Sequence, residues 1–229
     1  MRFITAALAA SALSVVSAVT VSTDFESGHD TSRWGTFITG TGASATLDST
    51  KAHSGSRSVK VVSPGGYAQH IFYGLSDISD VKAGGDIYGR YWANFQNALT
   101  SDHVTFMHMT DASQQALRMG GQFSVVDWNR AGDDSIMPDG SPQSIAGSVA
   151  IKAGTWTCFE FHISPSTGQI ETWIDNNFIT SLSTPQSRWG STYKPNVSNW
   201  GLGWESYGSG ANTIWYDDLA LGNSRIGCS

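Results

Sequence analysis

The chain has 229 residues, a formal net charge of −6 and only 14% charged residues. This length suits one large domain with its own core, and an apolar content of 40% argues against disorder. Two cysteines exclude a disulfide-rich miniprotein and a four-thiolate zinc site. The acidic balance, without any run of Lys and Arg, argues against nucleic acid as the main partner because phosphate binding needs clustered cations.

The N-terminal segment has the pattern of a secretory signal peptide. Arg2 is followed by an apolar, Ala-rich stretch, Phe3–Val16, and small residues lead to a cleavage point after Ala18. We therefore predict a signal peptide over 1–18, a single mature domain over 19–229, and secretion. A membrane anchor is the alternative, but serines interrupt a stretch that is short for a span. No later segment approaches transmembrane length, so no membrane partner is expected.

Short strand-like runs follow, separated by turns rich in Gly, Ser, Asn and Asp. In Thr155–Ile163, for example, Phe159 and Phe161 alternate with polar residues, as in a strand with one buried face. About ten such strands, with one short helix or turn near 77–82, predict an all-β antiparallel sandwich of jelly-roll type. The predicted strands are Ser58–Val62, Gln69–Tyr73, Ile87–Phe95, His103–Met109, Ala116–Val126, Ser148–Ile151, Thr155–Ile163, Gln169–Ile174, Trp200–Glu205 and Asn212–Leu221.

Secretion has two further consequences for the chain. An oxidising compartment makes a Cys158–Cys228 disulfide plausible, which would tie the end of the chain to a strand. Asn196-Val197-Ser198 is an N-glycosylation sequon in a loop rich in Pro and Ser, so Asn196 is the predicted acceptor.

A candidate calcium site comes from three dispersed pieces of sequence that converge if the first and last strands pair. Calcium takes six to eight hard oxygens from carboxylates and backbone carbonyls. Glu26 and Asp217 would supply the charge, and the turn Ser54–Arg57 would supply carbonyls. The alternative, solvated edge carboxylates beside an ordinary turn, remains open. His53 is interpreted as a structural hydrogen-bonding residue.

A candidate binding surface lies around Arg118 and Gln122, which are separated by an even number of positions, with Gly120 between them. On a strand these two side chains face the same side, roughly 13 Å apart at about 3.3 Å per residue, a distance that suits two neighbouring sugar rings. Arg and Gln can neutralise a carboxylate through fork-like hydrogen bonds. The alternative is an ordinary solvated face of the sandwich.

Other candidates lie near these two residues or late in the chain. His103 can act as a base near neutral pH, and Tyr207 as a base or an acid. The candidate substrate-binding residues are Trp128, Arg130 and Trp204, the tryptophans through contacts with sugar rings.

Several segments, in order along essentially the whole mature chain, resemble a family of secreted fungal cellulose-induced proteins with a jelly-roll core. That family is itself similar to the fungal glucuronan lyases. The segments are Asp24-Phe25-Glu26-Ser27-Gly28, Ala52-His53-Ser54-Gly55-Ser56, His103-Val104-Thr105-Phe106, Leu117-Arg118-Met119-Gly120-Gly121-Gln122, Gly203-Trp204-Glu205 with Tyr207, and Trp215-Tyr216-Asp217-Asp218.

The resemblance implies a jelly roll with a concave carbohydrate groove, one structural Ca²⁺, and lyase activity on glucuronic-acid polymers during plant cell wall degradation. The residues carried over are Glu26, Ser54, Arg57 through its carbonyl, and Asp217 as calcium ligands, and His103, Arg118, Gln122 and Asp134 in the groove. This chain departs from the family pattern at Ala116, where a groove histidine is expected, and at Trp128, where a tyrosine is expected. A second, N-terminal cysteine pair is also missing.

These observations leave three hypotheses for function. The first is a uronan lyase that acts by β-elimination, with His103 as base, Arg118 and Gln122 binding the carboxylate, and Asp134 orienting the base or the arginine. The second is a non-catalytic carbohydrate-binding accessory protein that uses the same groove. The third is a glycoside hydrolase, which needs two flanking carboxylates such as Glu160 and Glu171. The expected partner is an acidic polysaccharide, and the expected state is a monomer.

Overall fold

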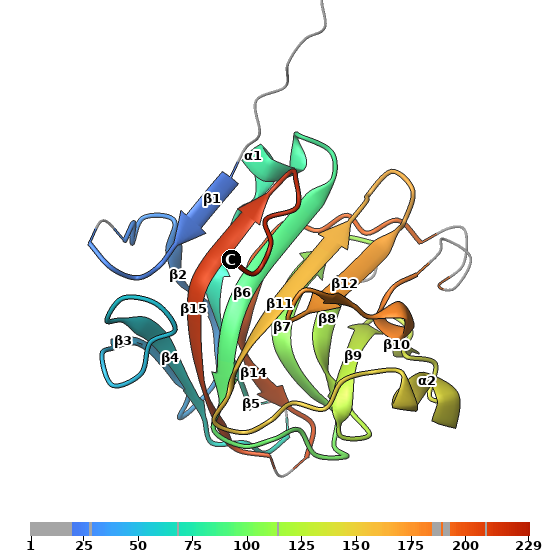
Figure 1. The fold of residues 1–229 in the computed structure, drawn as a ribbon, viewed down its shortest axis with the longest axis horizontal. Coiled ribbons are helices and arrows are strands. Elements are labelled where there is room, and N and C mark those ends of the chain that lie inside the picture. The colour runs from blue at the N-terminus through green and yellow to red at the C-terminus, as the bar shows by residue number, and fades with distance from the viewer. Residues whose placement is uncertain are drawn as a thin grey trace, which may run out of the picture.

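The computed structural model describes residues 20–27, 29–67, 69–113, 115–184, 189, 193–208 and 210–229. Two antiparallel sheets pack face to face, so the predicted all-β sandwich is confirmed (Figure 1). The predicted signal peptide over 1–18 lies outside the described residues. Across the described part of the chain, no helix is long and apolar enough to cross a membrane.

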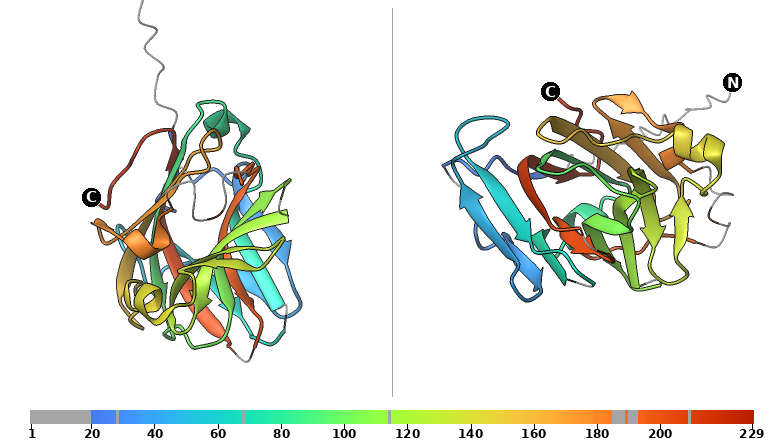
Figure 2. Two further views of the ribbon diagram at one scale, coloured as in Figure 1. Left: turned by 90° about the vertical axis from the view of Figure 1, so that its right-hand side faces the viewer. Right: turned by 90° about the horizontal axis from the view of Figure 1, so that it is seen from below.

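The two sheets lie beside each other, seen from their edges, when the molecule is turned by 90° (Figure 2, left). The eight-stranded sheet contains β13 (Asn177–Phe178), β12 (Ile170–Ile174), β11 (Trp156–Ile163), β6 (Ile87–Phe95), β15 (Asn212–Gly222), β4 (Ser58–Ser63) and β3 (Ser44–Asp48) in that order, with β1 (Thr20–Thr23) also paired to β15. The seven-stranded sheet contains β10 (Ser135–Met137), β9 (Val125–Arg130), β8 (Gln115–Gln122), β7 (Val104–Asp111), β14 (Trp200–Ser206), β5 (Gln69–Leu75) and β2 (Trp34–Thr39). The short helices are α1 (Ser79–Lys82), α2 (Pro142–Ala146) and the 3₁₀ turn η1 (Thr180–Leu182).

The core lies between the two sheets and is rich in aromatic rings. Phe161 of β11 meets Trp128 of β9 edge to face, with 6.1 Å between ring centroids, and it also contacts Trp200 of β14. The alternation predicted for β11 is present, since Phe159 and Phe161 face this core. Its other face is buried too, because the C-terminal segment covers it: the Arg225 guanidinium bonds to Glu160.

One predicted strand is in fact two. The run Ala116–Val126 contains a hairpin turn at Phe123 and Ser124, whose φ angles are 57° and 65°. Two successive residues with positive φ are typical of the type I′ hairpin, which usually takes Asn-Gly, and this sequence has neither residue there. The turn joins β8 to β9 and pairs Arg118 with Asn129. Even-numbered residues of β8 therefore share a face with odd-numbered residues of β9.

Other boundaries were less predictable. The strand expected over Ser148–Ile151 is irregular backbone. The strands β1, β2, β3, β10 and β13 had no strong pattern because they are short or largely exposed. The predicted Cys158–Cys228 disulfide is present, with an S–S distance of 2.04 Å.

The last strand changes partners along its length. β15 pairs with β4 over Asn212–Tyr216 and with β1 over Leu219–Gly222, while its pairing with β6 shifts register between Asp217 and Ala220. Asp217 and Asp218 lie at this irregularity, where Asp218 has a φ of 48°. Their side chains are thereby directed at the neighbouring turn rather than into a regular ladder.

Candidate functional site

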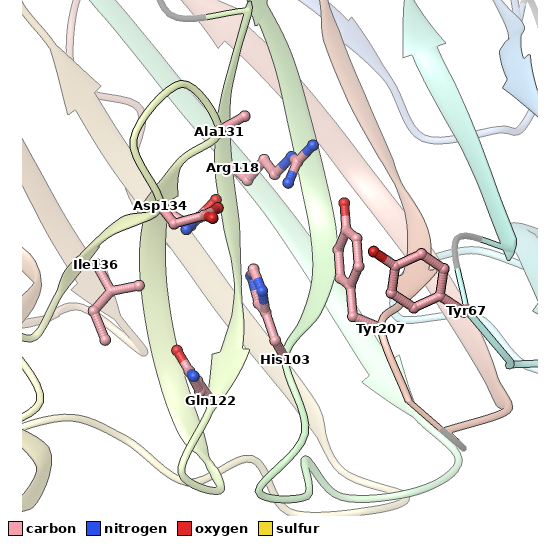
Figure 3. A pocket seen from close by; sticks show the side chains of 9 residues that line it. Tyr67, His103, Arg118, Gln122, Ala131, Asp134, Ile136 and Tyr207 are labelled. Carbon is pink, nitrogen blue, oxygen red and sulfur yellow. The ribbon is translucent and has the colours of Figure 1, made fainter.

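A cavity of about 530 Å³ opens on the face of the seven-stranded sheet that points away from the core (Figure 3). Most of its lining is polar. The lining residues are Tyr67, His103, Arg118, Gln122, Asn129, Ala131, Asp134, Ile136 and Tyr207. Five of these were predicted from the sequence, and the structure brings all five together: His103, Arg118, Gln122, Asp134 and Tyr207.

Arg118 and Gln122 both project from β8 into this cavity, as their shared parity predicted. The Arg118 guanidinium lies 5.7 Å from the ring centroid of Tyr207. The Nε atom of Arg118 is buried and has no hydrogen-bond partner among the described residues. The guanidinium therefore has a donor that the fold does not use.

His103 and Tyr207 lie side by side in the middle of the cavity (Figure 3). Their rings stack with 5.0 Å between centroids, and the Tyr207 backbone N–H donates to the His103 carbonyl at 3.0 Å. Burial, together with the positive charge of Arg118, lowers the pKa of His103. Burial, together with the Glu205 carboxylate, raises the pKa of Tyr207 to about 12. At neutral pH the pair is therefore an unprotonated imidazole beside a protonated phenol.

Asp134 lies across the cavity from Tyr207, at an exposed turn with a φ of 51° (Figure 3). Its negative charge raises the pKa of His103, which partly offsets the effects of burial and of Arg118. Asp134 is therefore close enough to influence the histidine electrostatically, as the hypothesis of an orienting carboxylate requires.

Four lining residues were not predicted: Tyr67, Asn129, Ala131 and Ile136. Tyr67 is 76% exposed and its ring meets Tyr207 edge to face, with 5.6 Å between centroids. Asn129 lies in the floor of the cavity, opposite Arg118 on the neighbouring strand. The predicted strand ended at Val126, so Asn129 was not predicted to lie on a strand, and the register that directs it into the cavity depends on the hairpin turn.

Both tryptophans predicted to bind substrate are in the wrong place for that role. Trp128 is fully buried and its Nε1–H donates to the Thr172 hydroxyl at 2.9 Å. Trp204 is only 3% exposed and its Nε1–H donates to the Gly210 carbonyl at 2.7 Å. Trp128 is next to Asn129, which lines the cavity, and successive residues of a strand face opposite sides. Both tryptophan rings belong to the core between the sheets.

The prediction that Arg130 binds substrate is also wrong. Like Trp128, Arg130 is an even-numbered residue of β9 and points away from the cavity. Its guanidinium pairs with Asp133, donates to the Trp189 carbonyl at 2.7 Å, and lies over the rings of Trp189 and Tyr193. Arg130 therefore fastens the loop beside β9 rather than facing solvent.

The carboxylates proposed for a hydrolase do not form a pair across a groove. Glu160 and Glu171 lie on β11 and β12 of the eight-stranded sheet, away from the cavity. Glu160 is bound by Arg225, and Glu171 accepts from the His162 ring at 2.6 Å. These contacts remove the support for the hydrolase hypothesis.

The residues of the predicted calcium site converge on a single turn. The backbone N–H groups of His53 and Ser54 donate to Asp217 Oδ2 at 2.7 and 3.2 Å. From the other side, the N–H groups of Ser56 and Arg57 both donate to Glu26 Oε1 at 2.7 Å. Both predicted carboxylates therefore hold the same turn, as expected if the first and last strands pair.

Two carboxylates face this turn, but the groups that the turn directs at them are N–H groups, so only the carboxylates are in place as calcium donors. Asp217 is fully buried, and burial raises its pKa to about 6, so a nearby cation would favour its ionised form. Gly55 has a φ of 59°, and a Cβ there would lie 2.7 Å from the Glu26 carboxyl, so the turn fits closely around that carboxylate. Among the described residues, no three His, Cys, Asp or Glu side chains already form a metal cluster, so carbonyl oxygens would have to complete the shell.

The structure also places His53 and the predicted glycosylation acceptor Asn196. His53 is a structural hydrogen-bonding residue, since its Nδ1 lies 2.6 Å from Asp218 and its ring stacks on Trp92 at 3.7 Å. Asn196 is exposed, as a glycosylation acceptor must be, and glycosylation itself stays a prediction.

Comparison with known proteins places this chain among polysaccharide lyase-like proteins. The core-domain model of the Cip1-like, polysaccharide lyase-like family matches residues 24–224. The chain therefore belongs to the Cip1-like family of polysaccharide lyase-like proteins. Among curated proteins, none matches this chain.

Solved structures agree with that family. The chain is similar to cellulose induced protein Cip1, with 40% identity, a TM-score of 0.82, and coverage of 91% of this chain and 100% of Cip1. It has the fold of an endo-β-1,4-glucuronan lyase from the fungus Trichoderma reesei, with 12% identity, a TM-score of 0.55, and coverage of 80% and 88%. The binding domain of botulinum neurotoxin DC, solved with rat synaptotagmin II, shares the fold at 8% identity and a TM-score of 0.53, with coverage of 81% and 43%.

Proposed function

We propose that the protein is a secreted polysaccharide lyase that cleaves glucuronic-acid polymers by β-elimination. The observation that carries the proposal is the juxtaposition of Arg118 and Gln122 with an unprotonated His103 and a protonated Tyr207 in one cavity. The disulfide is compatible with an oxidising, extracellular compartment. The glucuronan lyase with the same fold supports the choice of polymer.

The reaction must overcome the weak acidity of the proton next to an ionised carboxylate. Arg118 and Gln122 donate hydrogen bonds to the uronate carboxylate and stabilise the enolate that forms when the proton leaves. Binding of this anion also offsets the positive charge that lowers the pKa of His103, so the imidazole becomes a stronger base when substrate is present. Substrate binding and base strength are thereby coupled.

The proton and electron movements divide between the two stacked rings. His103 takes the proton from the carbon that bears the carboxylate, and the electron pair forms a double bond to the neighbouring carbon. The bond from that carbon to the 4-linked oxygen breaks, and the Tyr207 hydroxyl protonates the leaving oxygen. The raised pKa of Tyr207 suits this acid role, because the phenol keeps its proton until the oxygen departs. The products are an unsaturated uronate and a new chain end.

Calcium is proposed as a structural ion held by Glu26, Asp217 and the carbonyls of Ser54 and Arg57. It would supply charge neutralisation at the turn that precedes β4, where Glu26 and Asp217 meet it, and no step of the elimination uses it. Removal of the ion should lower the melting temperature, because it would leave the buried Asp217 carboxylate without a cation. An unchanged melt after demonstrated metal removal would contradict a structural ion.

Ultraviolet absorbance tests the proposed function directly. The purified protein is incubated with glucuronan, alginate and polygalacturonate, and the absorbance of the unsaturated uronate is followed. We expect a rise with glucuronan that disappears in Arg118→Ala and in His103→Ala. A matched control is Arg33→Ala, which removes a surface arginine paired with Asp80 at 2.9 Å, outside the cavity lining. Uronan binding measured by calorimetry without any absorbance change would replace the lyase with a carbohydrate-binding accessory protein.

A further inference from the structure

Asn129 is a buried side chain whose hydrogen-bonding groups are unused. It is only 1% exposed, yet it lines the cavity. Neither its Oδ1 nor its Nδ2 has a hydrogen-bond partner in the described part of the chain. An amide buried without partners costs roughly 1–3 kcal/mol, so such a group in a native fold needs an explanation.

The other buried asparagines show what this fold does with an amide that serves stability. Asn212 accepts from the Asn97 N–H at 3.1 Å and from the Thr213 N–H at 3.0 Å, and it donates to the Asn97 carbonyl at 3.1 Å. Asn94 accepts from the Lys51 ammonium at 3.1 Å. Asn129 has no such bonds, so its amide is not explained by the folding of the chain.

The position of Asn129 indicates what the amide is for. In the register of β8 and β9 it is directly opposite Arg118, and both residues line the cavity. Side chains directly opposite across an antiparallel pair have Cβ atoms about 5 Å apart. The unpartnered Nε of Arg118 and the unpartnered amide of Asn129 therefore lie beside each other. Neither group is used by the fold, and both residues line the same cavity.

We propose that Asn129 is a substrate-binding residue that contacts the same uronate ring as Arg118. Its Nδ2–H donates to the carboxylate, and its Oδ1 accepts a hydrogen bond from a hydroxyl of that ring. A sugar acid offers an acceptor and a donor close together, which matches an amide better than a purely anionic or purely neutral ligand does. This assignment rests on the proposed function for the identity of the ligand.

The neutral amide also has an electrostatic advantage over a second cation. Another arginine or lysine beside Arg118 would lower the pKa of His103 further, as Arg118 already does. An asparagine adds a donor for the carboxylate without that effect. The cavity thereby strengthens carboxylate binding while leaving the basicity of the imidazole unchanged.

The test compares Asn129→Leu with the matched control Asn212→Leu, using calorimetric titration with glucuronan oligosaccharides and thermal melts without ligand. For Asn129→Leu we expect affinity to fall at least about tenfold, the value of roughly one hydrogen bond to a charged group, while the melting temperature stays the same or rises. For Asn212→Leu we expect a lower melting temperature and the affinity of the wild type. A second variant, Asn129→Asp, should fold and lose affinity for the polyanion, because its carboxylate pairs with Arg118.

Three results would overturn the assignment, and they differ. If Arg118→Ala loses affinity while Asn129→Leu and Asn129→Asp bind like the wild type, Asn129 is not a binding residue and the proposed function stands. If the wild type binds no uronan at all, both the proposed function and the role of Asn129 fail. A drop in melting temperature for Asn129→Leu equal to that of Asn212→Leu, with unchanged affinity, would make Asn129 a structural residue.

Discussion

Both sheets contain buried polar atoms without a hydrogen-bond partner among the described residues, such as Arg90 Nε and Trp92 Nε1 on β6, but Glu160 and the cavity residues show a clear contrast. On the eight-stranded sheet, Glu160 is only 2% exposed, and its carboxylate accepts from Arg225 Nη2 at 2.9 Å and from the Gly227 N–H at 2.9 Å. On the cavity side of the seven-stranded sheet, Asn129, His103 Nε2 and Arg118 Nε have no partner among the described residues. The Glu160 carboxylate is therefore used by the fold, whereas the polar groups of Asn129, His103 and Arg118 named here are not.

The histidines repeat the contrast. His162 on the eight-stranded sheet has Glu171 at 2.6 Å and Asp86 at 3.2 Å, and its ring stacks on Tyr88 with 4.3 Å between centroids. His103 in the cavity stacks on Tyr207, but its Nε2 is unpartnered and its pKa is lowered. Unpartnered buried groups reduce stability, and active sites are where proteins tolerate that reduction. The contrast therefore predicts that substitutions on the two sheets act on different properties.

The largest effect is expected from the disulfide that fastens the C-terminal segment over the eight-stranded sheet. Its two cysteines are 70 residues apart in sequence. The double substitution Cys158→Ala with Cys228→Ala should lower the free energy of unfolding by about 4 kcal/mol, since the unfolded chain regains the freedom of a long loop. Urea unfolding measures this change. An equally large loss of uronan affinity would contradict the prediction that the eight-stranded sheet contributes to stability and not to uronan binding.

Arg118→Ala should have the opposite profile. We expect affinity for uronan oligosaccharides to fall about a hundredfold, as a charge-assisted contact to the carboxylate is lost, with little change in the melting temperature. The Nε of this guanidinium contributes no hydrogen bond to the fold, and the contacts that the substitution removes are those with Tyr207 at the edge of the cavity. Arg33→Ala is the control, and calorimetric titration with parallel melts gives both numbers. A large drop in melting temperature would show that the cavity arginine is structural.

Glu160→Ala, on the eight-stranded sheet, should reduce stability without reducing uronan affinity. The substitution leaves the Arg225 guanidinium and the Gly227 N–H without their acceptor and should cost about 2 kcal/mol of folding free energy. Uronan affinity should be that of the wild type, because Glu160 lies on the sheet remote from the cavity. Urea unfolding and calorimetry on the same preparation test both statements, and equal stability of variant and wild type would refute the first.

The smallest effect is a pH dependence from Asp127, which is buried on β9 with both carboxyl oxygens unpartnered among the described residues. Burial raises its pKa to about 8, whereas an aspartate in the unfolded chain titrates near pH 4. The folded state therefore binds the extra proton between these values, and stability falls as pH rises from about 4 to about 8. Between pH 6 and 7 this amounts to about 1 kcal/mol.

Asp127→Asn should remove this slope, because the amide does not titrate. The measurement is the free energy of unfolding in urea at pH 6 and pH 7 for both proteins. The variant should gain stability relative to the wild type as pH rises. The same pH dependence in both proteins would mean that Asp127 is ionised in the folded state.

Much of the cavity could be predicted from the sequence because β8 is a regular strand. The positions of Arg118 and Gln122 in the strand put both on one face, residue type made His103 and Tyr207 candidates, and the resemblance to a known family added Asp134; all five line the cavity. The errors at Trp128 and Arg130 came from β9, where residue type suggested sugar binding. The turn at Phe123 and Ser124 has no Asn-Gly signal, so the register that sends these side chains away from the cavity was not apparent.

The sequence by itself determined the class of fold, because strand alternation and frequent turn residues are local properties that persist in any packing of an all-β chain. It also determined the disulfide, since only two cysteines are present. Only the tertiary structure decided which face each strand turns to the cavity and which buried polar groups find partners there. Asn129 and Asn212 are the same residue type, and their different roles follow from cross-strand register, which depends on contacts between residues distant in sequence.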